Sequence, residues 1–144
     1  MTHLLDTNVL SEFQRPEPDR NVIAWLTTAD ETGLFLSVVS LAEIHRGVAL
    51  MNVGARRRAL ESWVREDLPR RFGPRVLDVT PAVAEAWGGL AARAQRAGAG
   101  LSVMDGLIAA TARVHGLTLA TRNVKDFAAL DVPLLNPWTP QAPT

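Results

Sequence analysis

The sequence predicts an α/β fold in which a mainly parallel sheet of four or five strands is flanked by helices. Short apolar runs bounded by turn residues alternate with longer segments whose apolar residues recur every three or four positions. Parallel neighbouring strands need a crossover of a dozen residues or more, and the helical segments supply it. The chain has 144 residues, 47% of them hydrophobic, which is enough for one contiguous core.

Short apolar runs predict the strands, and the segments between them predict the helices. The expected strands are residues 2–5, 33–37, 76–79 and 117–120, with 134–135 as an edge. The expected helices are residues 19–29, 39–51, 55–72, 82–97 and 103–115. Pro81 suits the first position of a helix, and Gly98 and Gly116 suit helix C-caps.

We expect a single domain over residues 1–138 and a flexible, proline-rich tail over residues 139–144. The chain has no cysteine, which excludes a disulfide framework and a thiolate metal site. No stretch approaches the roughly 18 apolar residues that cross a bilayer. These features predict a cytoplasmic protein that is not inserted in a membrane.

Fifteen basic and fifteen acidic residues give a net charge of zero, which argues against a strongly basic nucleic-acid binder. Charge is concentrated locally, however. Between Arg56 and Arg75 lie seven arginines and three acidic residues, an excess of four positive charges. This segment either faces phosphates or is a solvated helix face, and the charge pattern does not decide between the two.

Asp6 directly follows the first predicted strand, where a buried carboxylate is costly unless it is paired. It either caps the next helix or binds a cation. Thr7 or Asn8 can cap a helix that begins near Val9, and this leaves Asp6 free for another role.

Two more acidic residues lie in apolar helical segments. Asp105 shares a helix face with residues expected to be buried, although it also suits the first turn of a helix capped by Ser102. Glu43 lies beside the small residues Ser40 and Gly47, which leave room for a ligand, although a surface ion pair with Arg46 is an equally simple explanation.

A fourth polar position follows the strand expected at 117–120. Asn123 comes after that strand, and Asp126 lies three residues later. Capping of the next helix explains both side chains without any chemistry.

Asp6, Glu43 and Asp105 repel one another strongly if the fold gathers them in one cleft. Protonation or a cation must then relieve the repulsion. Oxygen ligands without cysteine or histidine suit Mg²⁺ or Mn²⁺, which meet substrate phosphates while keeping part of their water shell.

Four segments in this order resemble the PIN-domain ribonucleases, and among them the VapC-type toxins of toxin–antitoxin pairs, with the FitB-like branch the most similar. The segments are "LLDTNVLSE", "SVVSLAEIHRGVAL", "DGLIAATARVHGLTLATRN" and "LLNPW". Together they span nearly the whole chain.

The resemblance implies a PIN-like fold and an endoribonuclease that uses Mg²⁺ or Mn²⁺ to hydrolyse RNA with water as the nucleophile. It implies a metal-binding triad of Asp6, Glu43 and Asp105, with Asn123 at a fourth position where the family commonly has aspartate. Asn8, Ser40 and Thr121 match positions that support such sites. Asp126 is a further supporting candidate that would compensate for the missing charge at Asn123, with helix capping as the alternative.

The resemblance also implies a homodimer and a cognate VapB- or FitA-like antitoxin. Val22, Trp25 and Leu26 are interface candidates, unless they pack in the core. Two other functions remain open: a catalytically impaired PIN domain that only binds RNA or antitoxin, and a phosphatase with Asp6 as nucleophile. The phosphatase typically needs a second aspartate two residues later, where this chain has Asn8.

Overall fold

The central sheet has five strands, all parallel, in the order β3-β2-β1-β4-β5. The computed structural model describes residues 1–141. The strands are β1 (His3–Leu5), β2 (Leu34–Ser37), β3 (Val76–Leu77), β4 (Thr118–Ala120) and β5 (Leu134–Leu135). The predicted fold class and all five predicted strands are confirmed.

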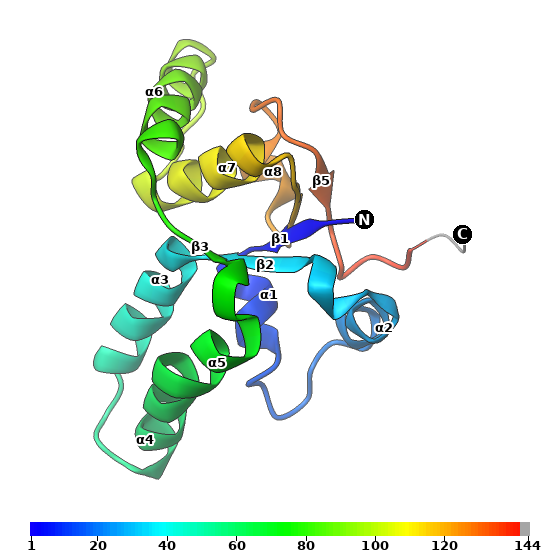
Figure 1. Ribbon diagram of the computed structural model, residues 1–144, viewed down its shortest axis with the longest axis vertical. Helices are drawn as coiled ribbons and strands as arrows, with labels where there is room; N and C mark the ends of the chain where they lie inside the picture. Colours follow the sequence, from blue (N-terminus) through cyan, green and yellow to red (C-terminus); the bar gives the residue numbers. More distant parts are fainter. Residues whose placement is uncertain (142–144) are drawn as a thin grey trace.

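Helices cover both faces of this sheet (Figure 1). The longer helices are α1 (Thr7–Glu12), α2 (Arg20–Thr28), α3 (Val38–Ala49), α4 (Ala55–Ser62), α6 (Pro81–Arg96) and α7 (Val103–His115). Two short ones, α5 (Leu68–Phe72) and α8 (Val124–Phe127), complete the set. In Figure 1, α6 and α7 lie above the sheet, and α3, α4 and α5 lie below it.

The core is divided between the two faces of the sheet. One cluster packs under α6 and α7 and contains Leu4, Ile108 and Phe127, all fully buried. The other packs against α1, α3 and the segment from α4 to α5, and contains Leu5, Leu10 and Leu36. Burial on both faces explains why the strands read as continuous apolar runs instead of alternating patterns.

The helix predicted over residues 55–72 is confirmed, and its middle turn is π-helical. Residues Trp63–Asp67 form a π-helical turn in which the Leu68 amide donates to the Trp63 carbonyl oxygen. Pro69 follows in the first turn of α5. Proline has no amide hydrogen to donate in an α-helical ladder, and the wider π-helical turn precedes it while the backbone stays helical.

The caps predicted for α6 and α7 are largely confirmed. Pro81 opens α6 after the N-cap Thr80, and Gly116 ends α7 in the left-handed conformation at φ 64°. Gly98 lies one residue beyond the C-cap of α6, at φ 70°. Gly116 and Gly98 thus have backbone angles that favour glycine.

Val22 and Trp25 are 0% and 9% exposed, so they belong to the core and not to an exposed interface. The prediction of an interface at these two residues is therefore wrong. Of the predicted tail, residues 139–141 are described and 142–144 lie outside the described residues. None of the helices in residues 1–141 combines the length and the apolar character that a membrane span requires.

The strand order reverses direction between β1 and β4. From β1 the chain moves outward to β2 and β3, and the later strands β4 and β5 lie on the other side of β1. In parallel sheets the crevice at the carboxyl ends of such strands is the common position for a ligand site.

Candidate active site

Asp6 lies at this crevice, directly after β1, and is 4% exposed. One carboxylate oxygen accepts from the Thr7 amide at 2.8 Å, and the other accepts from the Thr121 hydroxyl at 2.7 Å. Asp6 is thus the N-cap of α1, which begins at Thr7. The prediction that Thr7 or Asn8 caps a helix starting near Val9 is wrong, because α1 begins at Thr7, directly after Asp6, and the Asp6 carboxylate accepts from the Thr7 amide.

Burial raises the pKa of the Asp6 carboxyl to about 6. Hydrogen bonds from Thr121 and Thr7 oppose this rise, and the negative charges of Asp105 and Glu43 add to it. Capping therefore does not account for Asp6 completely, because two nearby carboxylates disfavour its charged form.

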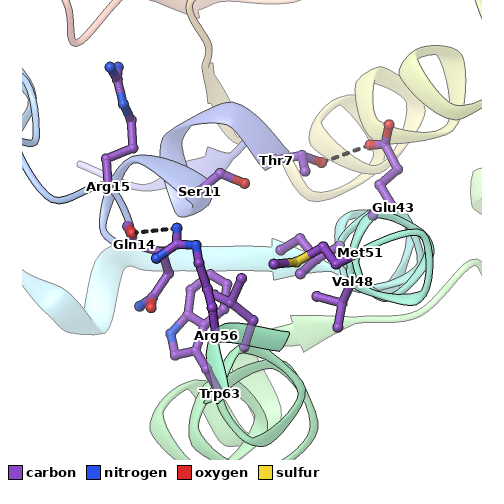
Figure 2. A pocket seen from close by; sticks show the side chains of 12 residues that line it. Thr7, Ser11, Gln14, Arg15, Glu43, Val48, Met51, Arg56 and Trp63 are labelled. Atoms are coloured by element: carbon purple, nitrogen blue, oxygen red, sulfur yellow. Dashed lines mark hydrogen bonds between the residues drawn. The ribbon is translucent and has the colours of Figure 1, made fainter. Parts of the chain in front are cut away.

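Glu43, in the middle of α3, is joined to α1 through Thr7. The Thr7 hydroxyl lies 2.7 Å from Glu43 Oε1 (Figure 2). It also lies 3.1 Å from the Ser40 hydroxyl. Ser40 is fully buried one turn before Glu43. Glu43 thus faces the Asp6 segment, and no ion pair with Arg46 exists in residues 1–141.

Asp105 lies in the first turn of α7, and its amide donates to the hydroxyl of the N-cap Ser102 at 3.1 Å. α7 leads into β4, so its N-terminus lies at the same edge of the sheet as the carboxyl end of β4. Burial raises the pKa of Asp105, a hydrogen bond with Ser102 opposes the rise, and the charge of Asp126 adds to it. The predicted cap is confirmed, and so is the burial of the helix face that Asp105 shares.

Asn123 follows β4 in a short exposed turn. Its backbone amide donates to the Thr121 hydroxyl at 3.0 Å, and its side chain makes no capping hydrogen bond to α8. The prediction that this side chain caps the next helix is wrong. Asp126 is exposed on α8, close enough for its charge to act on Asp105.

Asn8 connects the two strand ends. Its side-chain nitrogen Nδ2 lies 3.4 Å from Asp6 Oδ2, and its side-chain oxygen Oδ1 lies 3.4 Å from the backbone nitrogen of Arg122. These long contacts bring the segment after β1 next to the segment after β4.

No basic side chain neutralises this group of acids. The ion pairs in residues 1–141 are Arg15–Glu12, Arg57–Glu61 and Arg71–Glu31, and all three lie outside the group. Within the same residues, no three His, Cys, Asp or Glu side chains converge closely enough to hold a metal ion between them. The arrangement fits a hydrated divalent ion, since Mg²⁺ commonly binds through one or two carboxylates and keeps several waters.

Thr7 is the site residue that sequence reasoning missed. It contacts Asp6 through its amide and Glu43 through its hydroxyl, so it joins two acids that lie far apart in the chain. Its position directly after Asp6 is the signal that the sequence offers, and the same position also suits a helix cap.

Known proteins resemble this chain over nearly its whole length. The sequence matches the family model described as PIN domain over residues 3–133. It is 38% identical over 135 residues to Toxin FitB from Neisseria gonorrhoeae, covering 94% of this chain and 97% of that protein. It is 36% identical over 137 residues to VapC ribonuclease Y4jK from Sinorhizobium fredii, covering 95% and 98% of the two chains.

The structural comparison agrees with the sequence comparison. The crystal structure of FitAcB from Neisseria gonorrhoeae superposes with a TM-score of 0.89 at 38% identity, covering 95% of this chain and 99% of that chain. The structure of FitAB bound to an IR36 DNA fragment gives a TM-score of 0.91 at 36% identity, covering 98% and 99%. The sequence, the all-parallel sheet and the acidic site at its edge show that the chain belongs to the PIN-domain family.

Proposed function

We propose that this protein is a metal-dependent endoribonuclease, the toxin of a VapBC-type toxin–antitoxin pair. One observation carries the metal dependence: Asp6 is buried beside two further carboxylates, with no cation among residues 1–141 to neutralise them. The VapC ribonuclease named among the relatives supports RNA as the substrate.

In this proposal Asp6 and Asp105 hold a Mg²⁺ or Mn²⁺ ion, and Glu43 binds it through water or orients the attacking water. When bound, such an ion lowers the pKa of water and neutralises charge on the phosphate. The hydrogen bond from Thr7 fixes the direction of Glu43. The hydrogen bond from Thr121 favours the charged form of Asp6.

Asn123 carries no charge, so a second ion on that side of the site would be bound more weakly than with an aspartate there. We therefore propose that a single ion is sufficient. Asp126 is exposed and acts at a distance on the pKa of Asp105.

The proposed partner is a small antitoxin, since the matching solved structures include FitAB and FitAcB. An RNA substrate and an antitoxin made with the toxin imply a cytoplasmic location. The homodimer and the single domain over residues 1–138 stay predictions.

A cleavage assay tests the proposal. Purified protein is incubated with a single-stranded RNA and, separately, with a small phosphomonoester, in Mg²⁺, Mn²⁺ or EDTA. We expect RNA cleavage that requires a metal ion and no hydrolysis of the phosphomonoester. Asp6→Asn should abolish cleavage, while Asn123→Asp should preserve or increase it.

Other results would favour the two other functions. Retention of RNA without cleavage in any metal would indicate an impaired PIN domain. Hydrolysis of the phosphomonoester alone would indicate the phosphatase, and equal activity of the wild type and Asp6→Asn would contradict the proposed site.

A further inference from the structure

A pocket of about 250 Å³ opens beside the acidic site, between α1, α3 and the segment from α4 to Trp63. Thr7 and Glu43 form part of its wall (Figure 2). A molecule in this pocket therefore contacts the same two residues that line the proposed catalytic site.

The inner wall of the pocket is apolar. Ile44 and Val48 are buried on α3, and Met51, Leu60 and Trp63 are half-buried around them. Trp63 supplies a flat aromatic surface, and Met51 supplies a polarizable sulfur. This wall is suited to a flat, weakly polar group.

The rim of the pocket is polar and positively charged. The guanidinium of Arg56 lies 3.4 Å from the Gln14 carbonyl oxygen, on the same side of the pocket as Trp63 (Figure 2). Arg15 is exposed and pairs with the buried Glu12 at 3.3 Å. The Glu12 carboxylate also accepts from the Asp19 amide at 2.7 Å, which fixes the loop that carries Arg15.

We propose that this pocket takes one unpaired nucleobase of the RNA substrate, next to the phosphate that is cut. Proteins read single-stranded RNA by stacking splayed bases on aromatic or guanidinium planes and by bonding their polar edges. The apolar wall accepts the face of the base, and Arg15 and Arg56 complement the flanking phosphates. The inference rests on the proposed function, because it assumes that RNA is the substrate.

The charge of the rim favours a nucleotide over an apolar side chain of a protein partner. An apolar side chain would fill the inner wall but would leave Arg56, which has no carboxylate partner in residues 1–141, without a complementary charge. A nucleotide complements both parts of the pocket, because its base packs on the apolar wall and its phosphate pairs with the charged rim. The arginine-rich helix α4 extends the positive charge away from the pocket.

Gly47 offers a way to fill the pocket without disturbing the core. It lines the pocket on α3, and a Cβ added there meets no atom within 4 Å. Gly47→Leu therefore projects a side chain into or across the pocket. Gly88→Leu is the matched control, since Gly88 is also exposed in a helix and open at Cβ but lies on α6, outside the pocket lining.

The test measures RNA binding in EDTA, where cleavage does not interfere. Fluorescence anisotropy compares the wild type and the two variants on one labelled single-stranded RNA and on a series of its copies, each lacking one base. We expect Gly47→Leu to weaken binding about tenfold, and Gly88→Leu to leave it unchanged. Removal of one particular base should weaken wild-type binding about tenfold and should not weaken binding by Gly47→Leu further.

Equal RNA affinity of Gly47→Leu and the wild type would overturn the inference. So would a series of RNAs in which removal of no single base weakens binding. Either result would favour a protein side chain as the occupant of the pocket. Because the assay needs no cleavage, base-dependent binding without RNA hydrolysis in Mg²⁺ would support the pocket while contradicting the proposed enzyme activity.

Discussion

Asp6 combines a structural and a chemical role in one carboxylate. It caps α1 through the Thr7 amide, yet burial and the charges of Glu43 and Asp105 disfavour its ionised form. A neutral capping residue would be cheaper for folding alone. A divalent ion, as proposed, would account for the retained charge.

The raised pKa of Asp6 predicts how the stability of the metal-free protein depends on pH. The carboxyl titrates at about 6 in the folded state against 3.8 ordinarily. Between about pH 4 and 6 the folded state therefore holds a proton that the unfolded state has released, so the free energy of unfolding falls as the pH rises. The loss is about 3 kcal/mol once the pH exceeds the folded pKa.

Asp6→Asn keeps a capping side chain and removes this titration, so it isolates the effect. In EDTA, urea unfolding should show the wild type losing stability relative to Asp6→Asn as the pH rises through this range. A constant difference between the two proteins across the range would mean that the pKa of Asp6 is not raised.

Thr121 holds Asp6 through a fully buried hydroxyl. Thr121→Val keeps the shape and removes the donor, so the pKa of Asp6 should rise further and the acid limb of the pH–activity profile should move to higher pH. At neutral pH the lost hydrogen bond should cost about 1–3 kcal/mol of stability. Thr121→Ser should restore both properties, whereas a stability loss with an unmoved pH profile would indicate packing alone.

The packing of α6 on α7 depends on Gly106, the residue after Asp105. A Cβ at Gly106 would lie 2.8 Å from Trp87 Nε1 and 2.9 Å from Trp87 Cδ1. The Trp87 indole therefore packs directly on the backbone of α7, at the turn that carries an acid of the site.

We predict that Gly106→Ala destabilises the protein by about 1–3 kcal/mol, because the indole must move. It should also lower RNA cleavage, because the turn that carries Asp105 shifts. Gly88→Ala has open space and should stabilise the protein by up to about 1 kcal/mol through helix propensity. Equal unfolding free energies for the two variants would show that Trp87 adapts without cost.

The elements differ in how well the sequence predicts them. Apolar runs bounded by turn residues were sufficient for all five strands, because both faces of a parallel sheet are buried. Periodicity also predicts one helix over residues 55–72, and the backbone is helical throughout this range. It does not predict the π-helical turn at Trp63–Asp67, which lies before Pro69, a residue without an amide hydrogen.

In the molecule as a whole, the sequence predicts which strand ends carry polar residues and that parallel strands bring those ends to one edge. It does not predict which of Asp6, Thr7 and Asn8 caps α1, since all three residue types are good caps. Nor does it predict that Thr7 joins Asp6 to Glu43, because that contact depends on how α1 packs on α3.

Direct binding of Mn²⁺ to the purified protein tests most directly whether a divalent ion neutralises the acids at this edge. In calorimetry at about pH 7.5, above the pKa of Asp6, we expect the wild type to bind one ion and Asp6→Asn to bind it at least tenfold more weakly. Equal binding by both proteins, or no binding by the wild type, would contradict the account.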